Sequence, residues 1–251
     1  MKEYKGSLPE IEVLSLTQDA RKVLPGSVFV AIRGTQADGH DFLPQACAQG
    51  AVAIVVENTA KVPAGYQGVV LQCKNSRVLL DQMAALFFRE PSKELFTYGV
   101  TGTNGKTSIT YMLEFILNEK KVPCGVLGTI NHHLGEKVWP TSMTTPDPIL
   151  LQQRLREMRE EGARAVAMEV SSHALHQHRV DQVHFNSVIF TNLTRDHLDY
   201  HKDMKDYLNS KQRLFTDLLW SSLKYPLFAI INIDDPWGAR LRLASNAVLW
   251  T

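Results

Sequence analysis

The sequence has few cysteines, and their pattern argues against two classes of small domain. Among 251 residues there are three, Cys47, Cys73 and Cys124, an odd number with no C-x-x-C spacing. A disulfide framework needs pairs of cysteines, and a zinc site needs closely spaced ligands. We therefore interpret the three thiols as buried apolar fillers in a reducing compartment.

The sequence also lacks a long apolar run and an excess of charge of one sign. No window approaches the roughly 20 apolar residues that a membrane span needs, and the first residues contain no signal core. The 27 Lys and Arg residues nearly balance the 26 Asp and Glu residues, for a net charge of +1. We expect a cytoplasmic protein that binds neither nucleic acid nor a membrane, because both favour basic patches.

Two segments of α/β pattern follow one another along the chain. In the first, Asp41 is the expected N-cap of a helix and Gly50 its left-handed exit. The predicted strands are 28–32, 51–57 and 69–72, and the predicted helices are 41–50 and 75–88. A proline among charges at 89–94 interrupts the pattern. We therefore predict two domains, over 1–91 and 92–251; the family resemblance given below implies that the first binds a UDP-substrate and the second ATP.

The second segment alternates apolar strands with helices, which indicates a mostly parallel, doubly wound sheet. The predicted strands are 95–100, 124–130, 164–170, 186–191 and 227–233, and the predicted helices are 107–120, 148–161 and 203–219. Asp147 is the expected N-cap of the helix that begins at Pro148, and Gly162 follows its end. The sequence stops soon after another apolar run, so we expect an incomplete domain. Ligands of such sheets bind at the carboxyl ends of the strands.

A glycine-rich turn lies between the first strand and the first helix of this segment. Residues 101–107 read TGTNGKT, which departs from G-x-x-x-x-G-K-[ST] because Val100 replaces the first glycine. Glycines let backbone N–H groups approach an anion, and the helix N-terminus adds partial positive charge. Lys106 is then expected at the outer phosphates of a nucleotide and the Thr107 hydroxyl at Mg²⁺. An ordinary turn that contains a lysine is the alternative.

Other polar residues follow predicted strands at the same sheet edge. Glu169 suits Mg²⁺, which takes few protein oxygens, although a surface glutamate explains it as well. The run 191–201 gathers ionisable groups at a strand end, as functional loops do. Asn232 precedes two aspartates that fit either a nucleotide or a helix cap. Locally, Lys211 resembles an ordinary exposed helix lysine. Seven histidines are interpreted as surface or hydrogen-bonding residues: His132, His133, His173, His176, His178, His184 and His201.

Taken together, these segments resemble the Mur ligase family over nearly the whole chain. The loop TGTNGKT is similar to the family's variant of the phosphate loop, and residues 19–31 with 38–40 resemble its UDP-binding first domain. The other matching runs, in the expected order, are 144–147, 168–173, 177–179, 196–199 and 211–215. Within the family, the pairing of 144–147 with 169–173 favours the ligases that add a diamino acid.

The resemblance implies ATP-dependent formation of an amide bond in peptidoglycan biosynthesis, and hence a role in cell shape and division. ATP would phosphorylate the D-glutamyl carboxylate of UDP-MurNAc-L-Ala-D-Glu, and meso-diaminopimelate or L-lysine would displace the phosphate. Catalytic roles fall on Lys106, Glu169, His197 and Lys211. Nucleotide binding falls on Gly102, Thr103, Asn104, Gly105, Lys106, Thr107, Ser108 and Asn232. We expect a monomer.

The resemblance also assigns metal and acceptor residues. Thr107 and Glu169 would bind one Mg²⁺, and Glu169, His197 and Lys211 a second, with Lys211 as a carbamate formed from CO₂. The UDP-MurNAc-dipeptide would contact Ala20, Thr144, Thr145, Ser171, Gln177 and Arg179. Ala20 stands where the family usually has serine.

Three alternatives stay open. The family's third domain, which selects the amino acid, has no counterpart in these 251 residues, so we expect the chain alone not to complete the ligation. One alternative is therefore a non-catalytic module that binds a UDP-sugar. Another is a sister ligase that adds D-Glu or D-Ala-D-Ala, or a folylpolyglutamate-type synthetase. A generic P-loop kinase or GTPase would explain Lys106 and Thr107 but not the first domain.

Overall fold

A computed structural model describes residues 10–34 and 37–251. The chain divides into two compact units, Met1–Leu80 and Asp81–Thr251, and the division falls inside helix α2 (Ser76–Phe87). The functional boundary predicted between residues 91 and 92 stays a prediction. Within the described ranges, no helix combines the length and the apolar character that crossing a bilayer requires.

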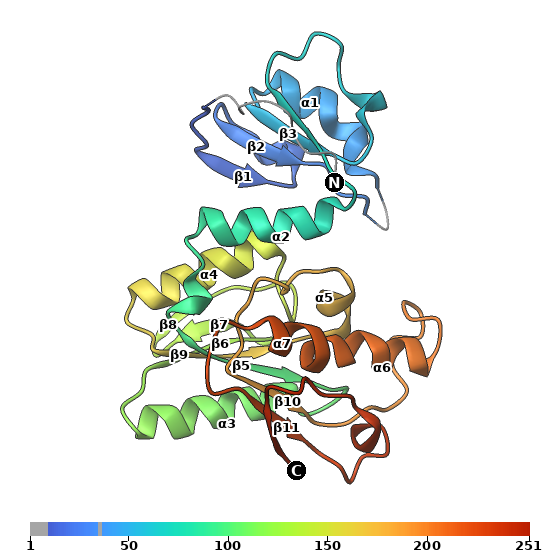
Figure 1. Ribbon diagram of the computed structural model, residues 1–251. Coiled ribbons are helices and arrows are strands. Elements are labelled where there is room, and N and C mark those ends of the chain that lie inside the picture. Colours follow the sequence, from blue (N-terminus) through green and yellow to red (C-terminus); the bar gives the residue numbers. More distant parts are fainter. Residues whose placement is uncertain (1–9, 35–36) are drawn as a thin grey trace. The chain divides into compact units, whose positions relative to one another are not determined.

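The first unit is built on a parallel four-stranded sheet in the order β1-β2-β3-β4 (Figure 1). The strands are β1 (Ser15–Thr17), β2 (Ser27–Val30), β3 (Ala53–Val56) and β4 (Val69–Gln72), and helix α1 spans Leu43–Ala48. Both central strands are buried throughout, so they carry apolar residues on both faces. Phe29, Leu43 and Ile54 form part of the core. Strand β1 was not predicted.

One helix start in this unit differs from the prediction. Asp38, not Asp41, accepts the cap hydrogen bond, from the His40 N–H at 3.0 Å, and begins the 3₁₀ turn Gly39–Phe42. Asp41 accepts from Lys61 Nζ at 2.6 Å. The predicted cap at Asp41 is therefore wrong. The left-handed exit at Gly50 is confirmed by its φ of 90°.

The second unit contains an eight-stranded sheet in the order β12-β11-β10-β5-β9-β6-β7-β8. Its strands are β5 (Phe96–Thr101), β6 (Cys124–Leu127), β7 (His132–Leu134), β8 (Lys137–Trp139), β9 (Ala165–Glu169), β10 (Ser187–Phe190), β11 (Phe228–Ile231) and β12 (Val248–Trp250). All neighbours from β12 to β6 are parallel, as predicted. The antiparallel additions β7 and β8 were not predicted.

The helices of this unit agree with the prediction in part. They are α3 (Lys106–Glu119), α4 (Pro148–Glu160), α5 (Ser172–His176), α6 (Met204–Arg213) and α7 (Leu219–Ser221). The short helix α5 was not predicted, whereas the helices predicted over 107–120 and 148–161 begin and end within one residue of the prediction. The helix predicted over 203–219 is interrupted by a π-helical turn at Leu214–Leu218. Short 3₁₀ turns lie at Ala20–Lys22, Thr59–Lys61, Pro91–Lys93 and Gly238–Arg240.

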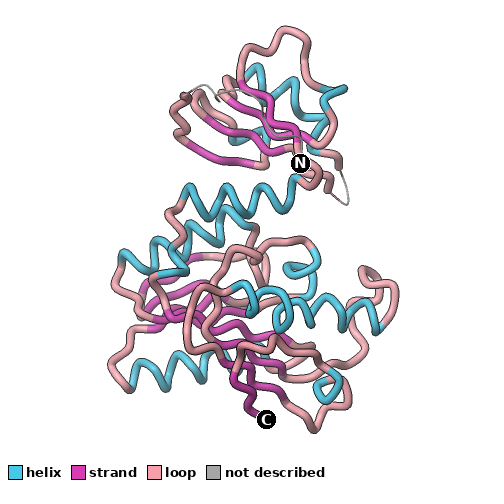
Figure 2. Tube along the Cα trace, in the orientation of Figure 1, coloured by secondary structure: helices cyan, strands magenta, loops and turns pink. Residues whose placement is uncertain are grey.

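Helices cover both faces of the sheet, which confirms the doubly wound prediction. Val166 and Met168 of β9 face the large core formed with α4, α5, α6 and α7. Ala165 and Ala167, the alternating residues, face α3. Figure 1 shows α3 and α4 on opposite sides of the strands, and Figure 2 shows the long loops that leave the strand ends.

Two interpretations of single residues are corrected. Cys124 is buried, but Cys47 and Cys73 are half-buried, so only one thiol is a core filler. His132 is buried rather than at the surface, and it has no hydrogen-bond partner on either ring nitrogen. His201 is buried as well, but its Nε2 lies 2.9 Å from Ser172 Oγ, in agreement with a hydrogen-bonding histidine. Burial lowers the pKa of His132 to about 4, which keeps that ring neutral.

Candidate active site

The phosphate loop turns between β5 and α3, and two of its glycines are required by geometry. Gly102 has a φ of 146°, and a Cβ atom there would lie 1.9 Å from Thr191 Oγ1. Gly105 has a φ of 85° and is the N-cap of α3. Other residues rarely adopt such positive φ angles. The loop conformation therefore depends on Gly102 and Gly105.

The loop that follows β10 holds the phosphate loop in place. The Thr103 N–H donates to Asn192 O at 2.9 Å, and the Asn104 N–H donates to Asn192 Oδ1 at 3.0 Å. Thr191 Oγ1 donates to Asn104 O at 2.6 Å. These bonds join the ends of neighbouring strands and fix the loop. Asn192 and Thr191 were singled out only as members of a polar run.

Lys106 lies along the phosphate loop. Its ammonium donates to Gly102 O at 3.0 Å and to Thr103 O at 2.9 Å. Burial lowers the pKa of Lys106, and Glu169 partly opposes this. Ser108 is exposed on the first turn of α3.

Glu169 ends β9 as a buried carboxylate, 1% exposed. Thr107 Oγ1 donates to its Oε1 at 2.8 Å, as does the Thr129 N–H at 2.9 Å. Thr129 Oγ1 donates to Oε2 at 3.1 Å. A Cβ atom on Gly128 would approach Oε1 to 2.5 Å, so the segment after β6 fits closely around the carboxylate. The predicted pair of Thr107 and Glu169 is thus in direct contact.

Several residues of the second unit that were predicted to bind the UDP-MurNAc-dipeptide form one hydrogen-bonded group, here named the acceptor group. Thr145 Oγ1 donates to Glu169 O at 2.8 Å and accepts from the Ser171 N–H at 3.0 Å. The Arg179 guanidinium donates to Thr145 O at 3.0 Å and to Gln177 Oε1 at 2.6 Å. Four predicted residues are therefore linked to one another, and Thr145 links them to the backbone of Glu169.

Thr129 connects this group to the phosphate loop. Its hydroxyl lies 3.0 Å from Thr144 Oγ1 and 3.1 Å from Glu169 Oε2. Thr144, Glu169 and Thr107 are consequently linked through one carboxylate and one hydroxyl. Sequence reasoning missed Thr129, although its place just after β6, at the carboxyl edge of the sheet, was a usable signal.

His197 and Lys211 both lie against the ring of Tyr207. The Lys211 Nζ is 4.6 Å from the ring centroid, and the His197 ring centroid is 5.9 Å from it. Lys211 is buried, and its ammonium donates to Gly102 O at 2.9 Å. Burial, with the nearby charge of Lys106, holds the pKa of Lys211 well below its usual range. The interpretation of Lys211 as an exposed lysine is wrong.

The donor chemistry around Glu169 fits Mg²⁺. The Thr107 hydroxyl and the Glu169 carboxylate are hard oxygen ligands in contact, and Mg²⁺ binds proteins through one or two carboxylates plus phosphates and water. No cluster of three or more His, Cys, Asp or Glu side chains suited to a metal occurs in ranges 10–34 and 37–251. A site with few protein ligands, completed by phosphate, agrees with both observations.

Two further predicted residues are Asn232, in the second unit, and Ala20, in the first. Asn232 follows β11, and its side-chain amide donates to Thr191 O at 2.8 Å and accepts from the Asp234 N–H at 3.1 Å. Ala20 is buried in the core of the first unit. Their predicted ligand contacts stay predictions.

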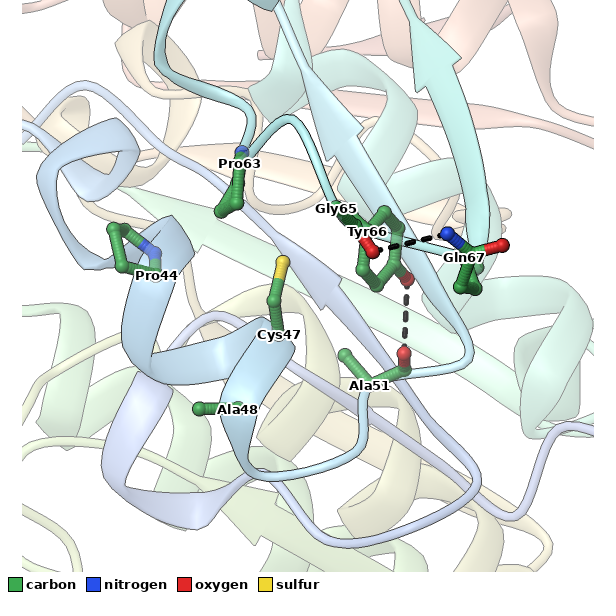
Figure 3. Close-up of a pocket in the computed structure, with 9 residues that line it drawn as sticks. Pro44, Cys47, Ala48, Ala51, Pro63, Gly65, Tyr66 and Gln67 are labelled. Carbon is green, nitrogen blue, oxygen red and sulfur yellow. Dashed lines mark hydrogen bonds between the residues drawn. The ribbon is translucent and has the colours of Figure 1, made fainter.

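The first unit also has an open pocket between α1 and the segment before β4 (Figure 3). Cys47 borders it, and Tyr66 donates its hydroxyl hydrogen to Ala51 O at 2.9 Å. The lining is mainly apolar and contains none of the predicted site residues. The pocket therefore adds nothing to the candidate site.

Two family profiles match the chain. The Mur ligase middle domain matches residues 100–248, which include the phosphate loop, Glu169 and Lys211. The profile described as Mur ligase family, catalytic domain, matches residues 12–88. The chain belongs to the Mur ligase family. The loop TGTNGKT at 101–107 lies within the segment that the middle-domain profile matches.

Curated Mur ligases resemble the chain over most of its length. The UDP-N-acetylmuramoyl-L-alanyl-D-glutamate--2,6-diaminopimelate ligase of Geobacter sulfurreducens is 46% identical over 231 residues, covering 92% of this chain and 45% of the relative. The protein of the same name from Geobacter metallireducens is 46% identical, covering 98% and 47%. The chain thus spans about half the length of the Mur ligases it matches.

Solved structures agree with this assignment. A structure titled as a UDP-N-acetylmuramoyl-L-alanyl-D-glutamate--2,6-diaminopimelate ligase has a TM-score of 0.76 at 29% identity, covering 91% of this chain and 45% of the other. A MurF structure from Acinetobacter baumannii has a TM-score of 0.63 at 22% identity, covering 96% and 48%. The second similarity shows the Mur ligase fold alone.

Proposed function

We propose that these residues belong to an ATP-dependent ligase that joins 2,6-diaminopimelate to UDP-MurNAc-L-Ala-D-Glu in the cytoplasm. The names of the relatives support 2,6-diaminopimelate over L-lysine as the amine. Because the chain spans about half of those relatives, the activity is proposed for the whole protein. We expect the 251 residues alone to bind ligands, as a monomer, without completing the ligation.

The observation that carries this proposal is the link through Glu169. On one side its carboxylate contacts Thr107 of the phosphate loop, and on the other its carbonyl contacts Thr145 of the acceptor group. A nucleotide on the loop and a carboxylate held by Arg179 would then lie on either side of one residue. Phosphoryl transfer depends mainly on such positioning and on charge stabilisation.

The proposed chemistry has two steps. A carboxylate oxygen of the D-glutamyl group attacks the γ-phosphorus of ATP, the bond to ADP breaks, and an acyl phosphate forms. The amine nitrogen, after losing a proton, attacks the acyl carbon, and phosphate leaves as the amide bond forms. Lys106 would stabilise charge on the transferring phosphoryl group. Arg179 would orient the acceptor carboxylate with its planar donors.

Thr107 and Glu169 would hold Mg²⁺, which neutralises phosphate charge when bound. We further propose that Lys211 carries a carbamate and, with His197 and Glu169, holds a second Mg²⁺. Its burial beside Gly102 supports this, because a buried uncharged amine is the form that reacts with CO₂. A carbamate would replace this buried amine by an anionic oxygen ligand.

Phosphate release by the whole protein tests the proposed function. ATP, UDP-MurNAc-L-Ala-D-Glu and meso-diaminopimelate together are expected to release phosphate at the rate of product formation. Omitting the diamino acid, or replacing it by L-lysine, should reduce turnover at least about tenfold, the scale of 1.4 kcal/mol in the barrier. Equal rates with D-glutamate and UDP-MurNAc-L-Ala would contradict the proposal in favour of a sister ligase.

A further inference from the structure

Tyr207 is a fully buried side chain that touches three parts of the site. Its hydroxyl lies 3.2 Å from Thr103 Oγ1 in the phosphate loop. Its ring stacks on His201 with centroids 5.0 Å apart and planes inclined by 29°. Lys211 Nζ and the His197 ring approach the same ring at 4.6 and 5.9 Å.

The helical spacing explains why Tyr207 reaches Lys211. Residues i and i+4 of a helix lie on one face, so the ring of Tyr207 and the side chain of Lys211 are neighbours on α6. Lys211 in turn donates to Gly102 O, the carbonyl that Lys106 also contacts. Helix α6 therefore meets the phosphate loop at Gly102 through Lys211 and at Thr103 through Tyr207.

The hydroxyl group of Tyr207 makes a contact that an apolar ring would not. A phenylalanine would occupy the same space and keep the contacts of the ring, but it would leave Thr103 Oγ1 without this partner. Thr103 Oγ1 also accepts from the Thr194 N–H at 3.0 Å, in the loop that carries His197. The Thr103 hydroxyl is thus a junction of the phosphate loop, α6 and the loop after β10.

We propose that Tyr207 is a positioning residue, which fixes the phosphate loop through its hydroxyl and the direction of the Lys211 side chain through its ring. The inference rests on the proposed function insofar as the loop binds nucleotide and Lys211 serves the reaction. It assigns separate tasks to two parts of one side chain. The two tasks can be separated by substitution.

Hydrogen exchange of the 251-residue chain without ligand tests the first task. In Tyr207→Phe, the amides of residues 102–106 should exchange about fivefold faster, the effect of one lost hydrogen bond. Amides of α6 should keep the wild-type rate. Tyr66→Phe is the matched control, because it also removes one hydrogen bond, to Ala51 O, in the other unit. Exchange of residues 102–106 at the wild-type rate in Tyr207→Phe would overturn the proposal.

The second task is tested on Lys211. With ¹³C-bicarbonate, Tyr207→Phe should keep the carbamate signal of the wild-type chain, whereas Tyr207→Leu should lose it. Retention of the full signal in Tyr207→Leu would refute the role of the ring. Should the Leu variant fail to fold, Tyr207→Met, which also lacks the ring, replaces it, and a full carbamate signal in that variant would likewise refute the role of the ring.

Failure of the proposed function is distinguishable from failure of this inference. If the wild-type chain binds no Mg²⁺-ADP and forms no carbamate, the proposed function fails, while exchange of residues 102–106 still decides the role of the hydroxyl. If the wild-type chain binds Mg²⁺-ADP and the Tyr207→Phe variant binds it about fivefold more weakly, the result supports both the proposed function and the positioning role of Tyr207.

Discussion

Glu169 is a carboxylate that is almost wholly removed from water, and donors on both of its oxygens compensate for its burial. An unpaired buried carboxylate would be strongly unfavourable. The donors come from α3 and from the segment after β6, so the position of the carboxylate is fixed by two elements. That rigidity suits the place that we propose for Glu169, between a nucleotide and an acceptor.

The first prediction concerns Thr107 as a metal ligand. Thr107→Ala removes the hydroxyl that contacts Glu169, so Mg²⁺-ATP should bind at least about tenfold more weakly, the scale of a lost hydrogen bond to a charged group. ATP without metal should bind nearly as it does to the wild-type chain. Calorimetric titrations with and without Mg²⁺ measure both affinities. Equal losses in the two titrations would show that Thr107 does not act through the metal.

Lys211 provides the second prediction. Lys211→Met retains a long unbranched side chain that suits a buried site but cannot form a carbamate. We expect the whole protein to lose activity by at least about a hundredfold, the usual scale for a group that stabilises developing charge. Added bicarbonate should restore nothing in the variant. Turnover like that of the wild-type protein, measured as phosphate release, would refute the carbamate.

Asp81 provides a prediction about pH. Its side chain is buried, and burial followed by the charge of Asp181 raises its pKa from 3.8 to about 8, although Arg213 and the N–H of Gln182 oppose the rise. The folded protein therefore holds a proton that the unfolded chain releases between these values. Stability should fall as pH rises, by about 1.4 kcal/mol per pH unit between about 4 and 8, and then level off.

Asp81→Asn is the matched variant, because its amide oxygen can still accept the Gln182 N–H and it does not titrate. Its free energy of unfolding should lose this dependence on pH. Denaturant unfolding of both proteins at pH 5 and pH 8 measures the difference. The prediction is wrong if the two proteins lose the same stability between these pH values.

At the scale of residues, sequence patterns predicted which charged residues belong to the candidate site better than they predicted how buried those residues are. The phosphate loop and Glu169 follow strands, and their contact was predictable because parallel strands end at one edge. The burial of Lys211 was not, because it depends on packing of α6 against a loop more than a hundred residues away. Tyr207 was missed for the same reason, although its spacing of four residues from Lys211 was visible.

At the scale of elements, long strands and capped helices were predictable and short pairings were not. Strand β1 has three residues and is defined by its pairing with β2. The hairpin of β7 and β8 likewise has two strands of three residues, too few for an alternation to be recognised. Helix α4, by contrast, begins and ends within one residue of its predicted limits.

Helix α4 carries a prediction of its own. Asp147 accepts from the N–H groups of Ile149 and Leu150, at 3.0 and 3.2 Å. Asp147→Ala should destabilise the protein by about 1 kcal/mol, and Asp147→Asn, which keeps a cap acceptor, should restore most of that loss. Thermal unfolding should show the Ala variant melting about 2–4 °C lower. Equal melting of the Ala and Asn variants would show that the cap contributes nothing.

At the scale of the whole molecule, the two profiles match one after the other along the chain, and the matched relatives are about twice as long. The alternation of strands and helices predicted the doubly wound sheet, because each strand–helix unit buries its apolar faces against the next. The division between the two compact units falls inside α2, a continuous helix that the alternation of strands and helices does not mark as a division.

The central claim is that this chain holds the acceptor of an ATP-dependent ligase beside its phosphate loop. Calorimetric titration of the 251-residue chain with UDP-MurNAc-L-Ala-D-Glu, and in parallel with UDP-MurNAc-L-Ala, tests it most directly. Tighter binding of the dipeptide form, by about tenfold for one carboxylate held by Arg179, is the expected result. Equal or tighter binding of UDP-MurNAc-L-Ala by the folded chain, or binding of neither, would contradict it.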